Sequence, residues 1–217
     1  MLYLVATPIG NLKDITLRAL EVLKGVDLIA CEDTRHSKIL LNHFGIRTPT
    51  TSYFQHNRFT KGQYILALLQ QGKNIALVSD AGTPGILDPG YHLIHLAIKN
   101  NIAMTVIPGP AAFISALVLS GRPTHEFIFA GFLPNRQQAR RNRLKELAKL
   151  KQTIVFYESC HRILATLADI QQLFANKEVV VARELTKKFE EVKRGTAAEI
   201  IAYFQKGAIR GEFVVVI

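Results

Sequence analysis

Three segments combine glycine and proline in a way that suits ligand binding by the main chain. Each one follows a short apolar run typical of a buried strand; they span residues 6–11 (ATPIGN), 79–90 (SDAGTPGILDPG) and 107–112 (IPGPAA). Glycine lets a ligand approach the backbone closely and proline stiffens a loop, so such segments present rigid N–H and C=O groups. A tight turn is the better interpretation of the first or third segment alone. The second segment holds three glycines, two prolines and two aspartates, which exceeds what a simple connection needs.

Several common ligand sites are excluded by the same residues. The dinucleotide fingerprint GxGxxG is absent, and Gly72-Lys73 lacks both the upstream glycine and the following Ser or Thr of a phosphate loop. The glycine-rich first loop of the common Rossmann methyltransferases is also missing. Cys31 and Cys160 are the two cysteines, and neither belongs to a spacing that suggests zinc. We therefore expect no metal site and a different set of ligand-binding loops.

Predicted strands and helices alternate along the chain and place these loops at strand ends. In the first part we expect strands at 2–7, 28–32, 74–79 and 105–108, with helices at 14–24, 34–44, 64–71, 91–100 and 111–119. In the second part we expect strands at 127–132, 153–157, 178–183, 189–194 and 212–217, with helices at 137–150, 163–174 and 197–205. The order of the first part predicts a largely parallel, helix-covered sheet, and the chain as a whole is expected to be an α/β protein. The turn formers of residues 120–126 predict a boundary between domains 1–120 and 126–217.

The charge of the chain favours a polyanionic partner. The formal net charge is +10, and 48% of the 217 residues are hydrophobic, enough for a substantial core. The cations are densest in 136–151, where seven basic residues accompany one acid, Glu146. A solvated helix face is the alternative interpretation, but the density favours contact with a nucleic-acid backbone. No signal peptide and no apolar run of roughly 18–20 residues is visible, so we expect a soluble, cytoplasmic protein.

Seven motifs in order along the chain resemble one known family. They are TPIGNLKDIT (7–16), CEDTRHS (31–37), SDAGTPGILDPG (79–90), PGPAA (108–112), GFLP (131–134), FYESCHR (156–162) and ARELTKKFEE (182–191). Together they resemble the tetrapyrrole-methylase superfamily of S-adenosylmethionine enzymes, and within it the ribosomal RNA small subunit methyltransferase I family. The resemblance implies two α/β domains with the cofactor in the interdomain cleft, and a homodimer. It also implies that the family's further C-terminal segment is absent here.

The resemblance implies methylation of the ribose 2′-hydroxyl of a cytidine in 16S rRNA of the 30S subunit. S-adenosyl-L-methionine is the implied cofactor, and its implied contacts are Pro8, Asp80, Ala81, Gly82, Thr83, Ile86, Ala111, Ala112, Phe132, Leu133, Glu158 and Leu185. A sulfonium is a cation without N–H donors, so it needs oxygen atoms and a negative field rather than a phosphate cradle. Asp80 either supplies that field or caps its loop.

A ribose hydroxyl is a weak nucleophile, so a proton acceptor should assist its attack. The acceptor candidates at strand ends are Glu32, Asp33, His36, Glu158, His161 and Glu184. We favour Glu32 or Asp33 first and Glu158 second, although the first two can equally cap the following helix. The RNA-binding candidates are Arg35, Arg136, Arg140, Arg141, Arg143, Arg162, Arg183 and Lys187.

Two other functions stay open on these residues. A tetrapyrrole acceptor on the same fold is one, although the basic charge and the CEDTRHS and ARELTK motifs argue against it. A ribosome-assembly or RNA-binding protein that keeps the loops as scaffold is the other. It predicts RNA binding without methyl transfer, and insensitivity to Gly82→Val.

Overall fold

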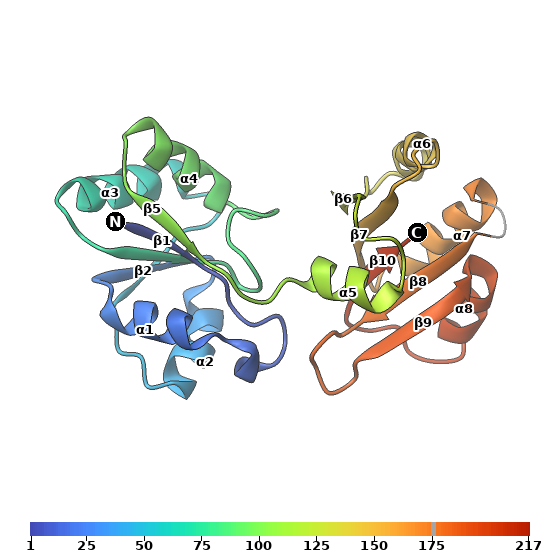
Figure 1. The fold of residues 1–217 in the computed structure, drawn as a ribbon, viewed down its shortest axis with the longest axis horizontal. Helices are drawn as coiled ribbons and strands as arrows, with labels where there is room; N and C mark the ends of the chain where they lie inside the picture. Colours follow the sequence, from blue (N-terminus) through green and yellow to red (C-terminus); the bar gives the residue numbers. More distant parts are fainter. Residues whose placement is uncertain (175–176) are drawn as a thin grey trace. The chain divides into compact units, whose positions relative to one another are not determined.

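A computed structural model describes residues 1–174 and 177–217 of the chain. It divides into two compact units, Met1–Ala111 and Ala112–Ile217. Figure 1 shows that each unit contains one sheet with helices packed on it. The sequence alone placed the boundary at residues 120–126. The units instead divide before the helix α5 (Ala112–Ser120), because this helix contacts three strands of the second unit.

The first unit holds a five-stranded, all-parallel sheet. Its strands are β1 (Leu2–Val5), β2 (Leu28–Cys31), β3 (Thr50–Ser52), β4 (Ile75–Val78) and β5 (Met104–Ile107), in the order β3-β2-β4-β1-β5. In the central pairs Leu4 lies opposite Leu77 and Val106. Because all five strands are parallel, their carboxyl ends meet at one edge, and the loops that leave them gather there.

Helices cover both faces of this sheet, as Figure 1 shows. They are η1 (Leu12–Asp14), α1 (Leu17–Gly25), α2 (Thr34–His43), α3 (Arg58–Gln70) and α4 (Gly90–Lys99). Residues of α1 and α2 form one apolar core with the sheet, and residues of α3 and α4 form another on the opposite face. All four residues of the central strand β4 are buried, as expected of a strand covered on both faces.

The second unit holds a mixed sheet. Its elements after α5 are β6 (Phe127–Phe132), α6 (Gln137–Leu147), β7 (Thr153–Ser159), α7 (Ile163–Leu173), β8 (Glu178–Arg183), β9 (Glu191–Thr196), α8 (Ala197–Phe204) and β10 (Glu212–Val216). The strand order is β6-β7-β10-β8-β9, and of the four pairs only β6–β7 is parallel. The parallel sheet predicted from the first part is therefore confirmed for the first unit, whereas in the second unit β10 inserts antiparallel between β7 and β8.

Two general features are absent from the described residues. Among them, no helix is both long and apolar enough to cross a bilayer. The same residues contain no group of three or more His, Cys, Asp or Glu side chains placed to hold a metal ion.

Candidate active site

The loop after β1 is joined to the loop after β4 by a two-residue antiparallel bridge. Thr7 N–H donates to the Gly82 carbonyl at 2.9 Å, and Gly82 N–H donates to the Thr7 carbonyl at 3.0 Å. The Thr7 hydroxyl also donates to the Ser79 carbonyl at 3.1 Å. The first two glycine- and proline-rich segments therefore form one structural feature, although more than seventy residues separate them.

Glycine is required where these loops meet. Gly82 has φ +78°, a left-handed conformation that L side chains rarely adopt. A Cβ on Gly109, in the loop after β5, would lie 3.0 Å from the Ala6 Cβ. The third segment therefore packs directly against the first, and all three segments gather at the edge where the strands end.

Asp88 closes the long loop between β4 and α4. Its carboxylate accepts from Gly85 N–H at 2.9 Å and from Gly90 N–H at 2.7 Å. Burial raises the pKa of this carboxyl, with the backbone hydrogen bonds acting against that rise. The sequence analysis did not single out Asp88 as a site residue. The available signal was an aspartate two residues before a glycine, a common turn pattern.

Asp80 connects the loop after β4 to the segment after β2. Its carboxylate accepts from the Asp33 N–H at 3.0 Å, a bond to another segment that decides between neither of its two predicted roles. The pKa of Glu32 is raised, first by burial and then by the negative charge of Asp80. Glu32 and Asp80 therefore lie close enough to interact, and together they make this edge of the sheet electronegative.

Asp33 and Glu32 are neighbours with different environments. The Asp33 carboxylate caps α2, accepting from Arg35 N–H at 2.8 Å, and pairs with the Arg35 guanidinium at 2.8 Å. The hydrogen bond from the Arg35 side chain, with that from its backbone, lowers the pKa of Asp33 to about 2. A carboxylate so firmly ionised is a weak proton acceptor. Of the two favoured residues, Glu32 is therefore the better candidate base.

The predicted cofactor contacts of the first unit differ in exposure. Ala81 and the side chain of Ile86 are exposed, whereas Pro8 and Gly82 are buried. Thr83 and Ala111 have intermediate exposure. A ligand at this edge would therefore meet main-chain groups and a few small or apolar side chains.

Glu158, the second choice for the base, has every side-chain oxygen engaged. It is buried at the end of β7, where one oxygen accepts from Ser159 N–H at 2.7 Å and the other from the Thr166 hydroxyl at 2.7 Å. The Arg162 guanidinium lies 2.7 Å from the first oxygen. This arrangement assigns Glu158 a structural role and argues against it as the base or as a side-chain contact of the cofactor.

The other predicted cofactor residues of the second unit fall into two classes. The Phe132 side chain is exposed, with its ring 5.5 Å from that of Tyr157. Leu133 belongs to the apolar core, so its side chain is not available to a ligand. Leu185 is also buried, between two residues with positive φ, Glu184 at +51° and Thr186 at +65°.

Five of the eight predicted RNA-binding side chains hold the second unit together instead. Arg140 and Arg141 both pair with buried Asp169, at 2.7 and 2.6 Å. The other three are Arg162, paired with Glu158; Arg183, paired with Glu191; and Lys187, paired with Glu184 and Glu212. Three predicted residues keep exposed positions: Arg35, Arg136 and Arg143.

Comparison with known proteins identifies the family. Residues 1–201 match the family described as Tetrapyrrole (Corrin/Porphyrin) Methylases. The chain is 50% identical to a ribosomal RNA small subunit methyltransferase I from Halalkalibacterium halodurans, across 100% of this chain and 75% of that protein. The protein of the same name from Synechocystis sp. is 53% identical, across 100% and 78%. That from Thermotoga maritima is 47% identical, across 100% of this chain and 97% of that protein.

Solved structures with the same fold are also similar to this chain. A cobalt precorrin-4 methyltransferase superposes with a TM-score of 0.74 at 18% identity, across 99% of this chain and 93% of that one. A uroporphyrin-III C-methyl transferase from Thermus thermophilus, complexed with S-adenyl homocysteine, gives a TM-score of 0.66 at 15% identity, across 99% and 96%. The chain therefore belongs to the tetrapyrrole methylase family and, within it, to the ribosomal RNA small subunit methyltransferase I family.

Proposed function

We propose that this chain transfers a methyl group from S-adenosyl-L-methionine to the ribose 2′-hydroxyl of a cytidine in 16S rRNA of the small ribosomal subunit. The observation that carries the proposal is the electronegative loop edge closed by the Thr7–Gly82 bridge. It occurs in a chain about half of whose residues are shared with relatives named as small-subunit rRNA methyltransferases.

The residues at this edge fit the proposed cofactor. Main-chain groups of Ala81 and Gly82 and the exposed Ile86 side chain suit an uncharged nucleoside and an amino-acid chain. The carboxylates of Glu32 and Asp80 supply the negative field that a sulfonium needs. Pro8, Thr83 and Ala111 complete the contacts proposed in the first unit.

Glu32 is the proposed proton acceptor. When bound, the cofactor supplies a methyl group on a very good leaving group, so the protein mainly aligns the acceptor oxygen. Glu32 takes the proton from the 2′-hydroxyl as that oxygen forms its new bond to carbon. Its raised pKa suits this role, because a base works best when its pKa approaches the working pH.

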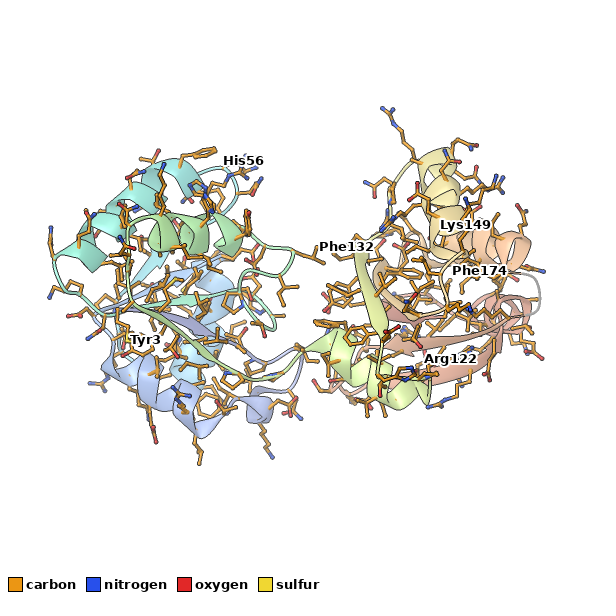
Figure 2. All side chains as sticks on the ribbon, turned by 45° about the horizontal axis from the view of Figure 1, so that its top comes forward. Tyr3, His56, Arg122, Phe132, Lys149 and Phe174 are labelled. Atoms are coloured by element: carbon orange, nitrogen blue, oxygen red, sulfur yellow. The ribbon has the colours of Figure 1, made fainter. Side chains whose placement is uncertain are left out.

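In the second unit, the proposed contacts to rRNA phosphates are exposed cations on α6 and on the residues just before and after it. Arg136, Lys145, Lys149 and Lys151 are all exposed, and Figure 2 labels Lys149 just beyond α6. These side chains give affinity without base specificity. The homodimer and the cytoplasmic location implied by the resemblance remain predictions.

A transfer assay with two acceptors tests the proposal. The purified chain is incubated with methyl-labelled S-adenosylmethionine and either unmethylated 30S subunits or a precorrin. Label in RNA alone supports the proposal, and label in the tetrapyrrole overturns it. RNA binding without any transfer, in protein that binds the cofactor by calorimetry, would favour the ribosome-assembly alternative.

A further inference from the structure

Helices α3 and α4 belong to a part of the chain that is nearly free of acidic residues. Between Asp33 and Glu126 the sequence contains two, Asp80 and Asp88. Both are held in the candidate active site by backbone N–H groups. The basic side chains of α3 and α4 are therefore not offset by carboxylates on those helices, and their face is electropositive.

This face also exposes large aromatic rings. The side chains of Phe59 on α3 and Tyr91 on α4 are 62% and 69% exposed. The Phe59 ring meets His92 edge-on at 4.9 Å between centroids, which connects the two helices. Tyr91 stacks on His95, at 6.3 Å and an interplanar angle of 19°. Exposed rings of this size commonly mark a binding surface.

Cations lie beside two exposed rings of α3, Phe59 and Tyr64. The Arg58 guanidinium lies 4.8 Å from the centre of the Phe59 ring, and the Lys61 ammonium lies 5.1 Å from that of Tyr64. His56, labelled in Figure 2, is exposed just before α3 and meets Phe54. We call this surface the α3–α4 face; its residues are Arg58, Phe59, Lys61, Tyr64, Tyr91 and His92.

The α3–α4 face begins at the same edge of the sheet as the candidate active site. Helix α3 follows β3 within a few residues, and α4 starts at Gly90, the last residue of the loop that Asp88 closes. A chain bound across the two helix starts would therefore run toward the loops that hold Glu32 and Asp80.

We propose that the α3–α4 face binds an unpaired, single-stranded segment of the substrate RNA. Phe59 and Tyr91 stack on bases, Arg58 contacts a phosphate beside Phe59, and Lys61, which also donates to the Thr51 hydroxyl, contacts a phosphate beside Tyr64. Aromatic rings interleaved with cations are the usual means of holding single-stranded nucleic acid, because every base has a face that can stack. The inference rests on the proposed function, because it gives the RNA that is methylated at the candidate active site a second point of contact on the protein.

Charge distinguishes RNA from a second copy of the chain as the occupant. Two copies meeting through this face would bring like charges together, since Arg58, Lys61 and Lys99 lie on the two helices and no carboxylate does. An RNA backbone instead neutralises these cations and releases its own counterions. The observations therefore favour RNA.

Binding of a fluorescein-labelled, mixed-sequence RNA dodecamer tests the proposal by anisotropy. The Phe59→Ala/Tyr91→Ala double variant should bind at least about tenfold more weakly than the unchanged chain, because each stack is removed. Tyr91→Phe should bind normally, since it keeps the ring. Lys61→Ala should lower the slope of log affinity against log salt by about one.

Tyr203→Ala in the second unit is the matched control. Its ring is also exposed, by 43%, and Lys193 lies 3.9 Å from its centre, but it lies outside the α3–α4 face. This variant should bind the dodecamer as the unchanged chain does. Equal weakening by Tyr203→Ala and by the double variant would contradict a dedicated surface.

Cofactor affinity and methyl transfer separate this inference from the proposed function. The double variant should bind S-adenosylmethionine normally by calorimetry and methylate 30S subunits with a raised KM. Weakened RNA binding in a chain that methylates no RNA would support the face and refute the function. If the unchanged chain methylates RNA and the double variant binds RNA with an affinity within twofold of the unchanged chain, the proposed RNA-binding role of the α3–α4 face is wrong and the proposed function stands. Dissociation of a dimer by the double variant, with RNA affinity unchanged, would assign the face to a second copy.

Discussion

The carboxylates of the two units serve different purposes. In the first unit, Asp80 and Asp88 accept hydrogen bonds from backbone N–H groups. In the second unit, Glu158 and Asp169 are buried against the guanidinium groups of arginines. Backbone N–H groups stabilise a carboxylate without cancelling its charge, whereas arginine cancels it.

This difference indicates which carboxylates are able to take part in the reaction. At the first edge, Glu32 has a raised pKa because of burial and the negative charge of Asp80. The second unit has its buried carboxylates neutralised, so their function is to hold α6 and β7 in place. A carboxylate without a counter-charge is a site candidate, and a paired one is usually structural.

The largest expected effect comes from Glu32. Glu32→Gln should lower the rate of methyl transfer by about 10²–10⁴-fold, because a proton acceptor contributes about that much. Binding of S-adenosylmethionine should weaken much less. Asp33→Asn is the control and should change the rate far less, since Asp33 caps α2 and pairs with Arg35. A fully active Glu32→Gln chain would contradict the assignment.

Removal of the buried carboxylate of Asp169 should have the next largest effect, on stability. Asp169→Ala leaves Arg140 without its partner inside the second unit, and breaking a buried pair costs about 3–5 kcal/mol. Urea denaturation should report this loss of unfolding free energy. Glu146→Ala, which breaks the exposed pair with Arg143, should change it by less than about 1 kcal/mol. Equal effects of the two changes would refute the contrast.

Gly82→Val tests whether the loop at Gly82 binds the cofactor, and Gly72→Val controls for the effect of backbone strain alone. Gly72 has a similar φ, +85° against +78°, but a Cβ there meets nothing within 4 Å. Both substitutions should lose stability, by at least about 1–2 kcal/mol for the left-handed conformation. Calorimetry should show a loss of cofactor affinity of about 100-fold or more for Gly82→Val alone, which corresponds to about 2.7 kcal/mol. The same loss in Gly72→Val would show that the effect is indirect.

A smaller contrast is expected between two arginines of neighbouring positions. Arg136→Ala should weaken RNA binding a few-fold and lower the salt slope by about one, with little change in Tm. Arg140→Ala should instead lower Tm, because it removes the more buried of the two guanidinium groups paired with Asp169. A lower Tm for Arg136→Ala, with RNA affinity unchanged, would reverse the two roles.

The pH dependence of Glu32 should be the subtlest signal. Its raised pKa means that the native state keeps the proton to a higher pH than the unfolded chain does. Methyl transfer should therefore rise with pH through that pKa, and the free energy of unfolding should fall over the same window. Glu32→Gln should abolish that fall, which paired pH titrations of the two chains would reveal. If the pH dependence of the unfolding free energy is the same in Glu32→Gln as in the unchanged chain, a group other than Glu32 is responsible for it.

Much of the fold was predictable because the patterns were local. Buried strands such as 28–32 and the glycine–proline segments followed directly from residue type and spacing. The start of α3 at Arg58 and the short strand β3 (Thr50–Ser52) were missed, because neither has a clear apolar period. The position of β10 between β7 and β8 was also beyond the sequence, since strand order depends on long-range packing.

The candidate site was predictable in its loops and less so in its charges. The 79–90 segment was recognisable from its glycines, prolines and aspartates. Glu158 and Glu32 were indistinguishable as residue types, and only their partners separate them. Arg140 and Arg141 belong to a basic run that favours RNA contact, yet the helix period turns them toward Asp169. Which face of α6 is buried becomes clear only once α7 is in place.

Mapping the methyl label tests the central claim most directly. The purified chain, methyl-labelled S-adenosylmethionine and unmethylated 30S subunits are combined, and the RNA is digested and analysed by mass spectrometry. The account predicts label on the ribose of one cytidine in 16S rRNA, produced by the unchanged chain and by Gly72→Val but not by Gly82→Val. Label on a base or on a different RNA, or equal label from Gly82→Val, would contradict it.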